Sequence, residues 1–318
     1  MRIAIVHSAE QWVVRFGERR KPTAVTIGNF DGVHLGHQKV LRRLLDRARH
    51  TDLMSAALTF YPHPARVLRP AEAPSLLETV DQRLSAIGAM GIDAALVARF
   101  DIDLARLGPQ DFVRRFLVDA MRAKAVLIGG NFRFGHRQAG DANTLTELGR
   151  LWGFDVEIVP PITAGGVVVS STAIRNALRD GRVDDARRML GRPFALAGQI
   201  QTGTGQGRKL VVPTLNLVTE QELLPRNGVY ATEAVVEGKA YYAATNIGVR
   251  PTFDGSRTTV ESHLLDFNET LTRGDMEVRF WARLRDERRF SGPAELREQV
   301  LRDIETAKEY FRIAAVKQ

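Results

Sequence analysis

The feature that most constrains this chain is a change of pattern near residue 190. Before it, short apolar runs alternate with amphipathic stretches. The runs that read as strands are Arg2–Val6, Thr23–Ile27, Ser55–Phe60, Ala94–Val97, Ala125–Ile128 and Phe154–Val159. The stretches with helical periodicity are Gly36–His50, Thr79–Met90, Pro109–Met121 and Asn143–Trp152. This alternation is typical of a mostly parallel sheet covered by helices, so we expect an N-terminal α/β domain.

The second part of the chain reads as closely spaced strands. Two short helices, Thr172–Arg179 and Val183–Leu190, precede the change of pattern. The strands expected after it are Ala195–Thr202, Gly228–Glu237, Lys239–Ile247, Thr258–Phe267 and Glu277–Leu284. This spacing favours an antiparallel β-barrel, followed by a terminal amphipathic helix with one apolar face: Leu296, Val300, Ile304, Ala307 and Phe311. We therefore predict two domains, 1–190 and 191–318.

Composition excludes several classes of protein. The 318 residues are enough for two hydrophobic cores, and the absence of cysteine excludes disulfides, thiolate metal sites and a cysteine nucleophile. No apolar stretch is long enough to span a bilayer, and the N-terminus lacks the features of a signal peptide, so we expect a cytoplasmic protein without membrane association. The net charge of +8 is spread over helical patterns, which favours solvated faces but also suits phosphate-bearing ligands.

A glycine-rich segment, 25–37, joins an expected strand to an expected helix. Its glycines let the backbone approach a ligand closely, and the free N–H groups of the helix suit a phosphate. His34 and His37 are three residues apart at the start of this helix, where both can donate hydrogen bonds to that phosphate. A lone histidine is more often a packed residue, but two in such a turn favour a nucleotide site.

The string Gly28–His37 resembles the HxGH signature of the nucleotidyltransferase superfamily. With its neighbours it resembles the adenylyltransferase module of bacterial bifunctional riboflavin kinase/FAD synthetases. The resemblance implies a Rossmann-like nucleotidyltransferase domain in which His34 and His37 stabilise the ATP phosphates as pyrophosphate leaves. It also implies nucleotide or phosphate contacts from the rest of the turn: Gly28, Phe30, Asp31, Gly32 and Gly36.

Two further segments resemble the same module. Residues 130–135, together with 139–141, resemble its loop near the flavin and nucleotide, and Asn131 is the candidate ligand contact there. Residues 170–175 resemble its SSTxIR motif. Ser171 or Thr172 can cap a helix whose N-terminus receives phosphate, and Arg175 can add a bidentate contact. A plain helix cap would explain this hydroxyl cluster equally well.

A second glycine-rich turn, 203–208, precedes the segment 210–216. Such a turn can hold phosphate through its backbone, and Gly207 and Arg208 are the candidate contacts. The segment resembles the riboflavin kinase module, whose Pro-Thr-x-Asn motif implies that Thr214 and Asn216 meet the Mg²⁺ of MgATP. The sequence departs from the usual Gly-Phe-Pro-Thr-Ala-Asn: it has valines at 211 and 212 and leucine at 215.

Residues 246–253 and 259–267 also resemble the kinase module. The resemblance makes Glu261 the catalytic base that accepts the proton of the ribityl 5′-hydroxyl. On a strand, Glu261 shares a face with His263 and Leu265. An isolated strand glutamate is more often simply exposed, but the upstream pair Thr214 and Asn216 favours catalysis.

The resemblance covers nearly the whole chain and predicts a bifunctional enzyme of FAD biosynthesis. It phosphorylates riboflavin to FMN and then adenylates FMN to FAD, using MgATP twice. We expect ATP, riboflavin and FMN as partners, with flavin-requiring apoproteins as further candidates and no nucleic acid. Three alternatives stay open at this point: a monofunctional adenylyltransferase with an impaired kinase, a different nucleotidyltransferase, and a basic nucleic-acid-binding or regulatory module.

Overall fold

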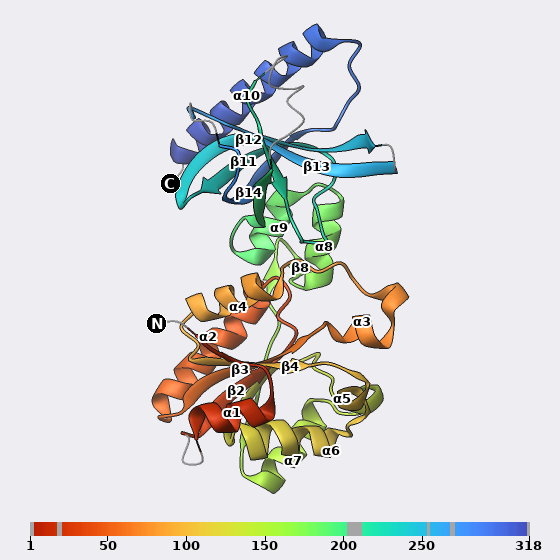
Figure 1. Ribbon diagram of the computed structural model, residues 1–318. Coiled ribbons are helices and arrows are strands. Elements are labelled where there is room, and N and C mark those ends of the chain that lie inside the picture. Colours follow the sequence, from red (N-terminus) through yellow and green to blue (C-terminus); the bar gives the residue numbers. More distant parts are fainter. Residues whose placement is uncertain (1–2, 18–20, 202–211, 253–254, 268–270, 317–318) are drawn as a thin grey trace. The chain divides into compact units, whose positions relative to one another are not determined.

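The computed structural model describes residues 3–17, 21–201, 212–252, 255–267 and 271–316. Packing divides the chain into two compact units, Met1–Ser170 and Ser171–Gln318 (Figure 1). Helix α8 (Ser171–Arg179) packs on α9 (Val183–Leu190), and α9 packs against strands of the second unit. These two helices therefore pack with the second unit, although they precede the domain boundary predicted at residue 190, which stays a prediction.

The first unit is built on a six-stranded parallel sheet with the strand order β1-β4-β3-β2-β5-β6. The strands are β1 (Ala4–Val6), β2 (Thr23–Ile27), β3 (Met54–Tyr61), β4 (Ala94–Arg99), β5 (Ala123–Gly129) and β6 (Asp155–Val159). Strands β3 and β4 follow in turn on one side of β2, and β5 and β6 follow on its other side. In such sheets ligands bind beyond the carboxyl ends of the strands where the order reverses, here between β2 and β5.

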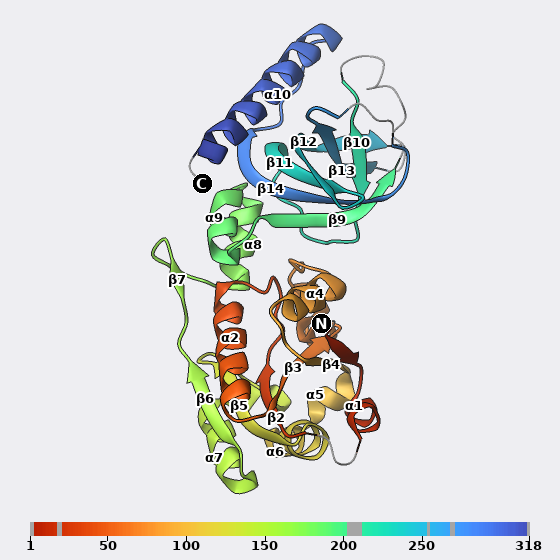
Figure 2. The ribbon, with the colours of Figure 1, turned by 90° about the vertical axis from the view of Figure 1, so that its left-hand side faces the viewer.

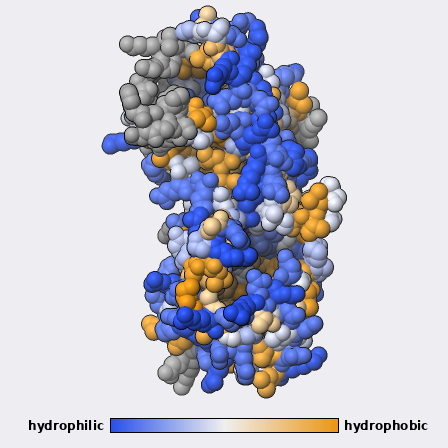
Figure 3. Space-filling view, turned by 90° about the vertical axis from the view of Figure 1, so that its right-hand side faces the viewer, coloured by the Kyte–Doolittle hydropathy of each residue, from blue (hydrophilic) through white to orange (hydrophobic). Residues whose placement is uncertain are grey.

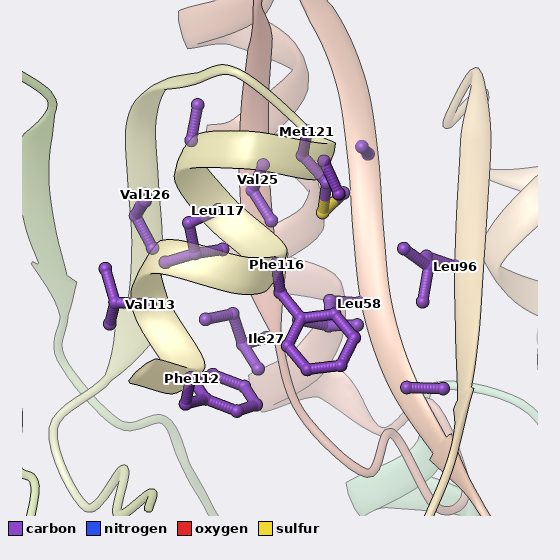
Figure 4. Close-up of a cluster of buried hydrophobic side chains, with 14 of the residues drawn as sticks. Val25, Ile27, Leu58, Leu96, Phe112, Val113, Phe116, Leu117, Met121 and Val126 are labelled. Atoms are coloured by element: carbon purple, nitrogen blue, oxygen red, sulfur yellow. The ribbon is translucent and has the colours of Figure 1, made fainter. Parts of the chain in front are cut away.

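Helices cover both faces of this sheet because its strands are apolar on both sides. Every residue of β2 is buried. Val25 and Ile27 face a cluster that includes Phe116 and Leu117 (Figure 4), whereas Ala24 faces Leu41 on the opposite side. The covering helices are α1 (Ala9–Phe16), α2 (Leu35–His50), α4 (Val80–Ala89), α6 (Pro109–Phe112), the π-helical segment η2 (Val113–Ala120) and α7 (Ala142–Trp152). This double-sided burial confirms the predicted α/β domain.

Smaller elements connect these layers. They are α3 (Pro64–Leu68), η1 (Pro70–Glu72), α5 (Ile102–Arg106), η3 (His136–Gln138) and the two-stranded hairpin of β7 (Thr163–Ala164) and β8 (Val167–Val168). These smaller elements were not predicted from the sequence, and neither was helix α1. The continuous helix expected over 109–121 changes to π geometry, in which the Met121 N–H donates to the Phe116 carbonyl at 3.0 Å.

The second unit is a closed antiparallel barrel with the order β10-β13-β12-β11-β14-β9. Its strands are β9 (Phe194–Gln201), β10 (Leu215–Val218), β11 (Gly228–Val236), β12 (Lys239–Thr252), β13 (Gly255–Leu264) and β14 (Asp275–Arg285). A tight turn at Glu237 and Gly238, which both have positive φ, at 50° and 78°, joins β11 to β12. The closed order of the strands confirms the predicted barrel.

The terminal helix α10 (Pro293–Val316) packs along the barrel, as Figure 2 shows, and confirms the predicted amphipathic helix. Ile304, Ala307 and Phe311 are buried against barrel residues such as Ala231 and Ala282. Arg285 at the end of β14 donates to the Asp303 carboxylate at 2.8 and 2.6 Å, which ties the same helix to the barrel.

The face of the molecule in Figure 3 is largely hydrophilic, with apolar residues scattered over it. Many of the exposed arginines pair with a nearby carboxylate, as Arg43 does with Glu157 at 2.6 Å and Arg182 with Asp185 at 2.6 Å. This interspersed charge agrees with solvated faces. In the described parts of the chain, no helix has the length and apolar character needed to traverse a bilayer.

Candidate functional sites in the two units

The glycine-rich segment 28–34 follows β2 at the point where the strand order of the first unit reverses. Strands β2 and β5 pair in parallel, with Thr26 opposite Leu127. The carboxyl ends of the two strands therefore meet, and the loop that begins with Gly130 and Asn131 lies at the same edge as the glycine-rich segment. The side chain of Asn131 is exposed there. The structure thus brings together two segments that are about 100 residues apart and that the sequence marked separately.

The backbone of this turn is held in an unusual conformation. Phe30 and Val33 have positive φ values of 50° and 35°, and the Val33 N–H donates to the Phe30 carbonyl at 3.1 Å. Gly32, at φ 88°, adopts a conformation that suits glycine. A positive φ is strained for a β-branched residue such as Val33, so the surroundings must hold the turn in place.

Asp31 supplies part of that support. Its carboxylate is 2% exposed and accepts hydrogen bonds from the backbone N–H groups of Leu77, at 2.9 Å, and Glu78, at 3.3 Å. Asp31 therefore fastens the turn to the segment that leads into α4. The structure gives Asp31 a structural role, and its predicted contact with nucleotide stays a prediction.

The two histidines lie together at the first turn of α2. His34 is the N-cap residue, and its Nδ1 accepts the backbone N–H of His37 at 3.3 Å. Because Nδ1 accepts, the proton of the neutral His34 ring is on Nε2, which is then a hydrogen-bond donor. The rings are stacked at 3.7 Å, and a Cβ on Gly36 would lie 3.1 Å from the His34 ring. Glycine at position 36 therefore lets the His34 ring fold back over the helix.

Burial keeps His37 uncharged. Desolvation is the largest cause that lowers its pKa well below 6.5, and the charges of His34 and Arg83 lower it further. Its Nδ1 is buried without a hydrogen-bond partner among the described residues. The edge of the Phe30 ring packs on His37 with 5.2 Å between the ring centroids. The predicted pair is thus two closely stacked imidazoles, at least one of them neutral at physiological pH.

Arg83 is a residue that the sequence analysis missed. It lies on α4, is 1% exposed, and its Nη1 donates to the Asn29 carbonyl at 2.6 Å. A single arginine in an amphipathic helix ordinarily marks the solvated face, so no sequence signal distinguishes it. Its contact with Asn29 makes it part of the same site.

The SSTxIR segment lies in the second compact unit. Helix α8 begins at Ser171, so Ser171 and Thr172 stand in its first turn, where backbone N–H groups lack helical partners. Arg175 is buried, at 7% exposure. The predicted contact of these residues with phosphate stays a prediction.

In the barrel, two of the predicted site residues, Asn216 and Glu261, lie directly opposite each other. Asn216 on β10 pairs in register with Glu261 on β13, and Glu261 pairs on its other side with Asn246 on β12. Opposite residues in antiparallel strands share a face with their Cβ atoms about 4.5–5.5 Å apart. Along β13, Glu261 alternates with Val260 and Ser262, whose side chains are buried. The row of Asn216, Glu261 and Asn246 therefore lies on the outer face of the barrel wall.

Thr214 is held near the same row. It is exposed and immediately precedes β10, and the ring Nδ1–H of His263 donates to the carbonyl of its neighbour Pro213 at 2.8 Å. Because His263 and Glu261 are two residues apart on β13, the segment Pro213–Asn216 runs alongside them. The structure therefore brings Thr214, Asn216 and Glu261 together. The predicted phosphate contacts Gly207 and Arg208 lie outside the described residues, as does Val211.

Asn246 and Glu287 extend this site beyond the predicted residues. A Cβ on Gly248 would collide with the Glu287 carboxylate and would lie 2.9 Å from Asn246 Nδ2, so both side chains crowd the same point. The Asn227 side chain donates to Glu287 at 3.2 Å. The motif that begins at Asn246 could have marked that residue as part of the site. Glu287 lies in a run of charged residues, and nothing in that run distinguishes it as a site residue.

These arrangements define the class of protein. The first unit offers hydrogen-bond donors and a helix N-terminus to a phosphate, and the second sets a carboxylate beside hydroxyl and amide oxygens that suit a hard cation. Together they define a two-domain nucleotide-dependent transferase.

Comparisons with known proteins identify the family. The FAD synthetase family model matches residues 17–173, and the riboflavin kinase model matches residues 190–311. The bifunctional riboflavin kinase/FMN adenylyltransferase of Escherichia coli K12 is 38% identical over 288 residues, which cover 90% of this chain and 92% of the relative. The Pseudomonas fluorescens protein of the same name is 38% identical over 89% of this chain and 91% of its own. The chain therefore belongs to the bifunctional riboflavin kinase/FMN adenylyltransferase family.

A solved structure extends the likeness to the fold. The crystal structure of a Streptococcus pneumoniae protein named as a macrolide-efflux protein has a TM-score of 0.85 and 27% identity, and covers 97% of this chain and 99% of its own. The family expected from the motifs is thus confirmed for both modules. The presence of both domains supports the bifunctional interpretation over a monofunctional adenylyltransferase.

Proposed function

We propose that this chain makes FAD from riboflavin in two successive ATP-dependent steps, one in each module. The observation that carries the proposal is the register of the barrel, which sets Asn216 directly beside Glu261 although the chain departs from the usual kinase motif at Val212 and Leu215. These departures leave the oxygen-bearing side chains and their pairing intact. Membership of the bifunctional family supports the same assignment.

In the first step, the ribityl 5′-hydroxyl of riboflavin attacks the γ-phosphorus of ATP. Glu261 accepts the hydroxyl proton, the bond from the γ-phosphorus to the β-γ bridging oxygen breaks, and FMN and ADP result. Hydroxyl and amide oxygens are suitable ligands for Mg²⁺, so Thr214 and Asn216 would hold the ion that accompanies ATP. That ion supplies charge neutralisation to the phosphates. Gly207 and Arg208 are proposed as further phosphate contacts.

In the second step, a phosphate oxygen of FMN attacks the α-phosphorus of a second ATP, and pyrophosphate leaves. The N-terminus of α2 and the Nε2–H of His34 donate hydrogen bonds to the phosphate oxygens, and His37 lies against His34. We assign nucleotide contacts to Gly28, Phe30, Asp31, Gly32, Gly36 and Asn131. We assign pyrophosphate contacts to Ser171, Thr172 and Arg175.

We propose that the activities divide near residue 190, with adenylyl transfer in 1–190 and riboflavin phosphorylation in 191–318. The FAD synthetase model ends at residue 173, within α8, and the riboflavin kinase model begins at residue 190, the last residue of α9, which supports this division. We further propose a cytoplasmic location, small-molecule partners and transfer of the product flavins to apoproteins, with no role for nucleic acid.

A chromatographic product assay tests the proposed function. The protein is incubated with ATP and Mg²⁺ and either riboflavin or FMN. We expect FMN and FAD from the first mixture and FAD from the second. FAD from FMN alone would mean that the residues around Pro213 have disabled the kinase. No product from either mixture, with a folded protein, would refute the proposal.

A further inference from the structure

Arg83 presents an unusual arrangement for a buried cation. Its side chain is 1% exposed, yet within the described part of the chain only Nη1 has hydrogen-bond partners: the Asn29 carbonyl at 2.6 Å and the Thr59 hydroxyl at 3.3 Å. Its Nε and Nη2 are buried and have none there. Burying a guanidinium with two unpaired nitrogens is energetically unfavourable, so this position requires an explanation beyond packing.

The contact with Asn29 places Arg83 at the base of the glycine-rich turn. The Asn29 carbonyl also accepts from the Thr59 hydroxyl at 3.4 Å, and the next residue, Phe30, has the positive φ of 50°. Asp31 is held by the backbone N–H groups of Leu77 and Glu78, just before α4. The strained turn is therefore fastened near the start of α4 at two points: the Asp31 carboxylate supplies one and the Arg83 guanidinium the other.

Charge connects Arg83 to the histidine pair as well. The groups that act on His37 are His34 on α2 and Arg83 on α4, and both lower the pKa of His37 in addition to its burial. The groups that act on Arg83 are Asp31, Glu78 and Tyr61; all three favour its charged form, whereas burial, the largest cause, lowers its pKa. A guanidinium stays protonated under physiological conditions, so the positive charge is retained.

We propose that Arg83 is a positioning residue of the adenylyl-transfer site, which fixes the Asn29 carbonyl and thereby the turn that carries His34 and His37. The inference rests on the proposed function of this site. Arg83 acts through the turn, and its charge adds to burial and to His34 in lowering the pKa of His37. It is distinct from every residue to which the sequence motifs assigned a role.

Three substitutions separate the hydrogen bond from the charge. Arg83→Lys keeps the charge and one donor, Arg83→Gln keeps a donor without the charge, and Arg83→Met removes both. Arg49→Met on the exposed last turn of α2 is the matched control. The first readout is the kcat/KM for FAD formation from FMN. FMN formation from riboflavin checks the second unit, and the fluorescence of Trp12 and Trp152 in a Trp281→Phe background checks folding of the first. The second is the His37 pKa from NMR titration of the imidazole signals.

We expect Arg83→Met to lower FAD formation roughly 100-fold, as a misplacement of about 1 Å does, with FMN formation unchanged. Arg83→Lys should recover most of this loss. The His37 pKa should rise in Arg83→Met and Arg83→Gln but not in Arg83→Lys or Arg49→Met. If Arg83→Met does not fold, the comparison of Arg83→Gln with Arg83→Lys decides.

The inference would be overturned if the wild type forms FAD and the Arg83 variants match it both in rate and in His37 pKa. The proposed function would still stand in that case. A rate loss without a change in the His37 pKa would overturn the charge component. Absence of FAD formation by the wild type would refute the proposed function instead, and the His37 titration would still test Arg83.

Discussion

At the scale of single residues, His34 serves both the helix and the chemistry. Its Nδ1 caps α2 by accepting the His37 N–H, and the same bond fixes the tautomer that exposes an N–H at Nε2. A change at this position therefore has two separable consequences, one for stability and one for phosphate binding.

We predict that His34→Asn and His34→Ala both lower FAD formation roughly 100- to 1000-fold, because each removes the Nε2 donor. Asparagine is among the best N-cap residues, so only the alanine variant should lose stability, by about 1 kcal/mol. Rates from product chromatography and denaturant unfolding would show this separation. Equal FAD formation by His34→Asn and wild type would contradict the role of the ring.

His37 should make the first unit sensitive to acid. Its folded pKa lies below 6.5, so between about 6.5 and that lower value the unfolded state binds a proton that the folded state does not. Stability contributed by this residue is therefore present above pH 6.5 and is lost as the pH falls, by up to about 1.4 kcal/mol per pH unit.

Unfolding by denaturant can be followed in a Trp281→Phe background, where the remaining tryptophans, Trp12 and Trp152, both report on the first unit. His37→Gln in that background should show a shallower loss of stability below pH 6.5 than the parent. Identical slopes in the two proteins would contradict the buried, neutral His37.

Glu261 is the residue that the kinase step depends on. We predict that Glu261→Gln lowers FMN formation from riboflavin roughly 100- to 10,000-fold, because the amide cannot accept the hydroxyl proton. FAD formation from supplied FMN should be unchanged. Glu277→Gln, on strand β14 of the same barrel, is the matched control and should retain FMN formation. Near-normal FMN formation by Glu261→Gln would remove it from catalysis.

The site residues that could be predicted are those that lie close in the sequence to other residues of the same motif. The histidine pair lies within one turn of helix, and Asn216 lies two residues from Thr214. Arg83 was missed because its partner, Asn29, is 54 residues away and only the fold joins them. Glu287 was missed for the same reason: it follows β14, whereas Asn246, its neighbour in space, is on β12.

At the scale of elements, the apolar face of α10 holds the terminal helix on the barrel. Phe311 is 5% exposed and its ring stacks on Tyr242 at 4.0 Å, whereas Ile313 is 45% exposed. We predict that Phe311→Ala destabilises the second unit by about 3–5 kcal/mol and that Ile313→Ala does not. On heating, Phe311→Ala should lose FMN formation at a lower temperature than wild type while FAD formation from FMN persists. Parallel loss of both activities would contradict this assignment.

Element boundaries followed the strength of the local pattern. Strand β2 matches its prediction because it is apolar on both faces and ends at a glycine-rich turn. Strand β10 has four residues, too few for an alternation to stand out, and its place is set by pairing with β9 and β13. The π geometry of η2, in which the Met121 N–H donates to the Phe116 carbonyl, is not encoded in helical periodicity.

At the scale of the whole molecule, each unit has its own core and its own set of chemical groups. The sequence predicted both fold classes because their hydrophobic periods differ. Packing nevertheless assigns α8 and α9 to the second unit, since α9 packs against β14 and β9 and α8 packs on α9. The amphipathic patterns of the two helices do not indicate which partner they cover. The two proposed sites share no residue, so we expect either reaction to proceed without the other.

Mixing two single-site variants tests this central claim most directly. His34→Asn should convert riboflavin only to FMN, and Glu261→Gln should form no FAD unless FMN is supplied. We predict that the mixture, given riboflavin, ATP and Mg²⁺, makes FAD, because FMN released by the first variant is a substrate for the second. A mixture that accumulates FMN without FAD, although Glu261→Gln converts added FMN, would contradict two independent sites linked by a free intermediate.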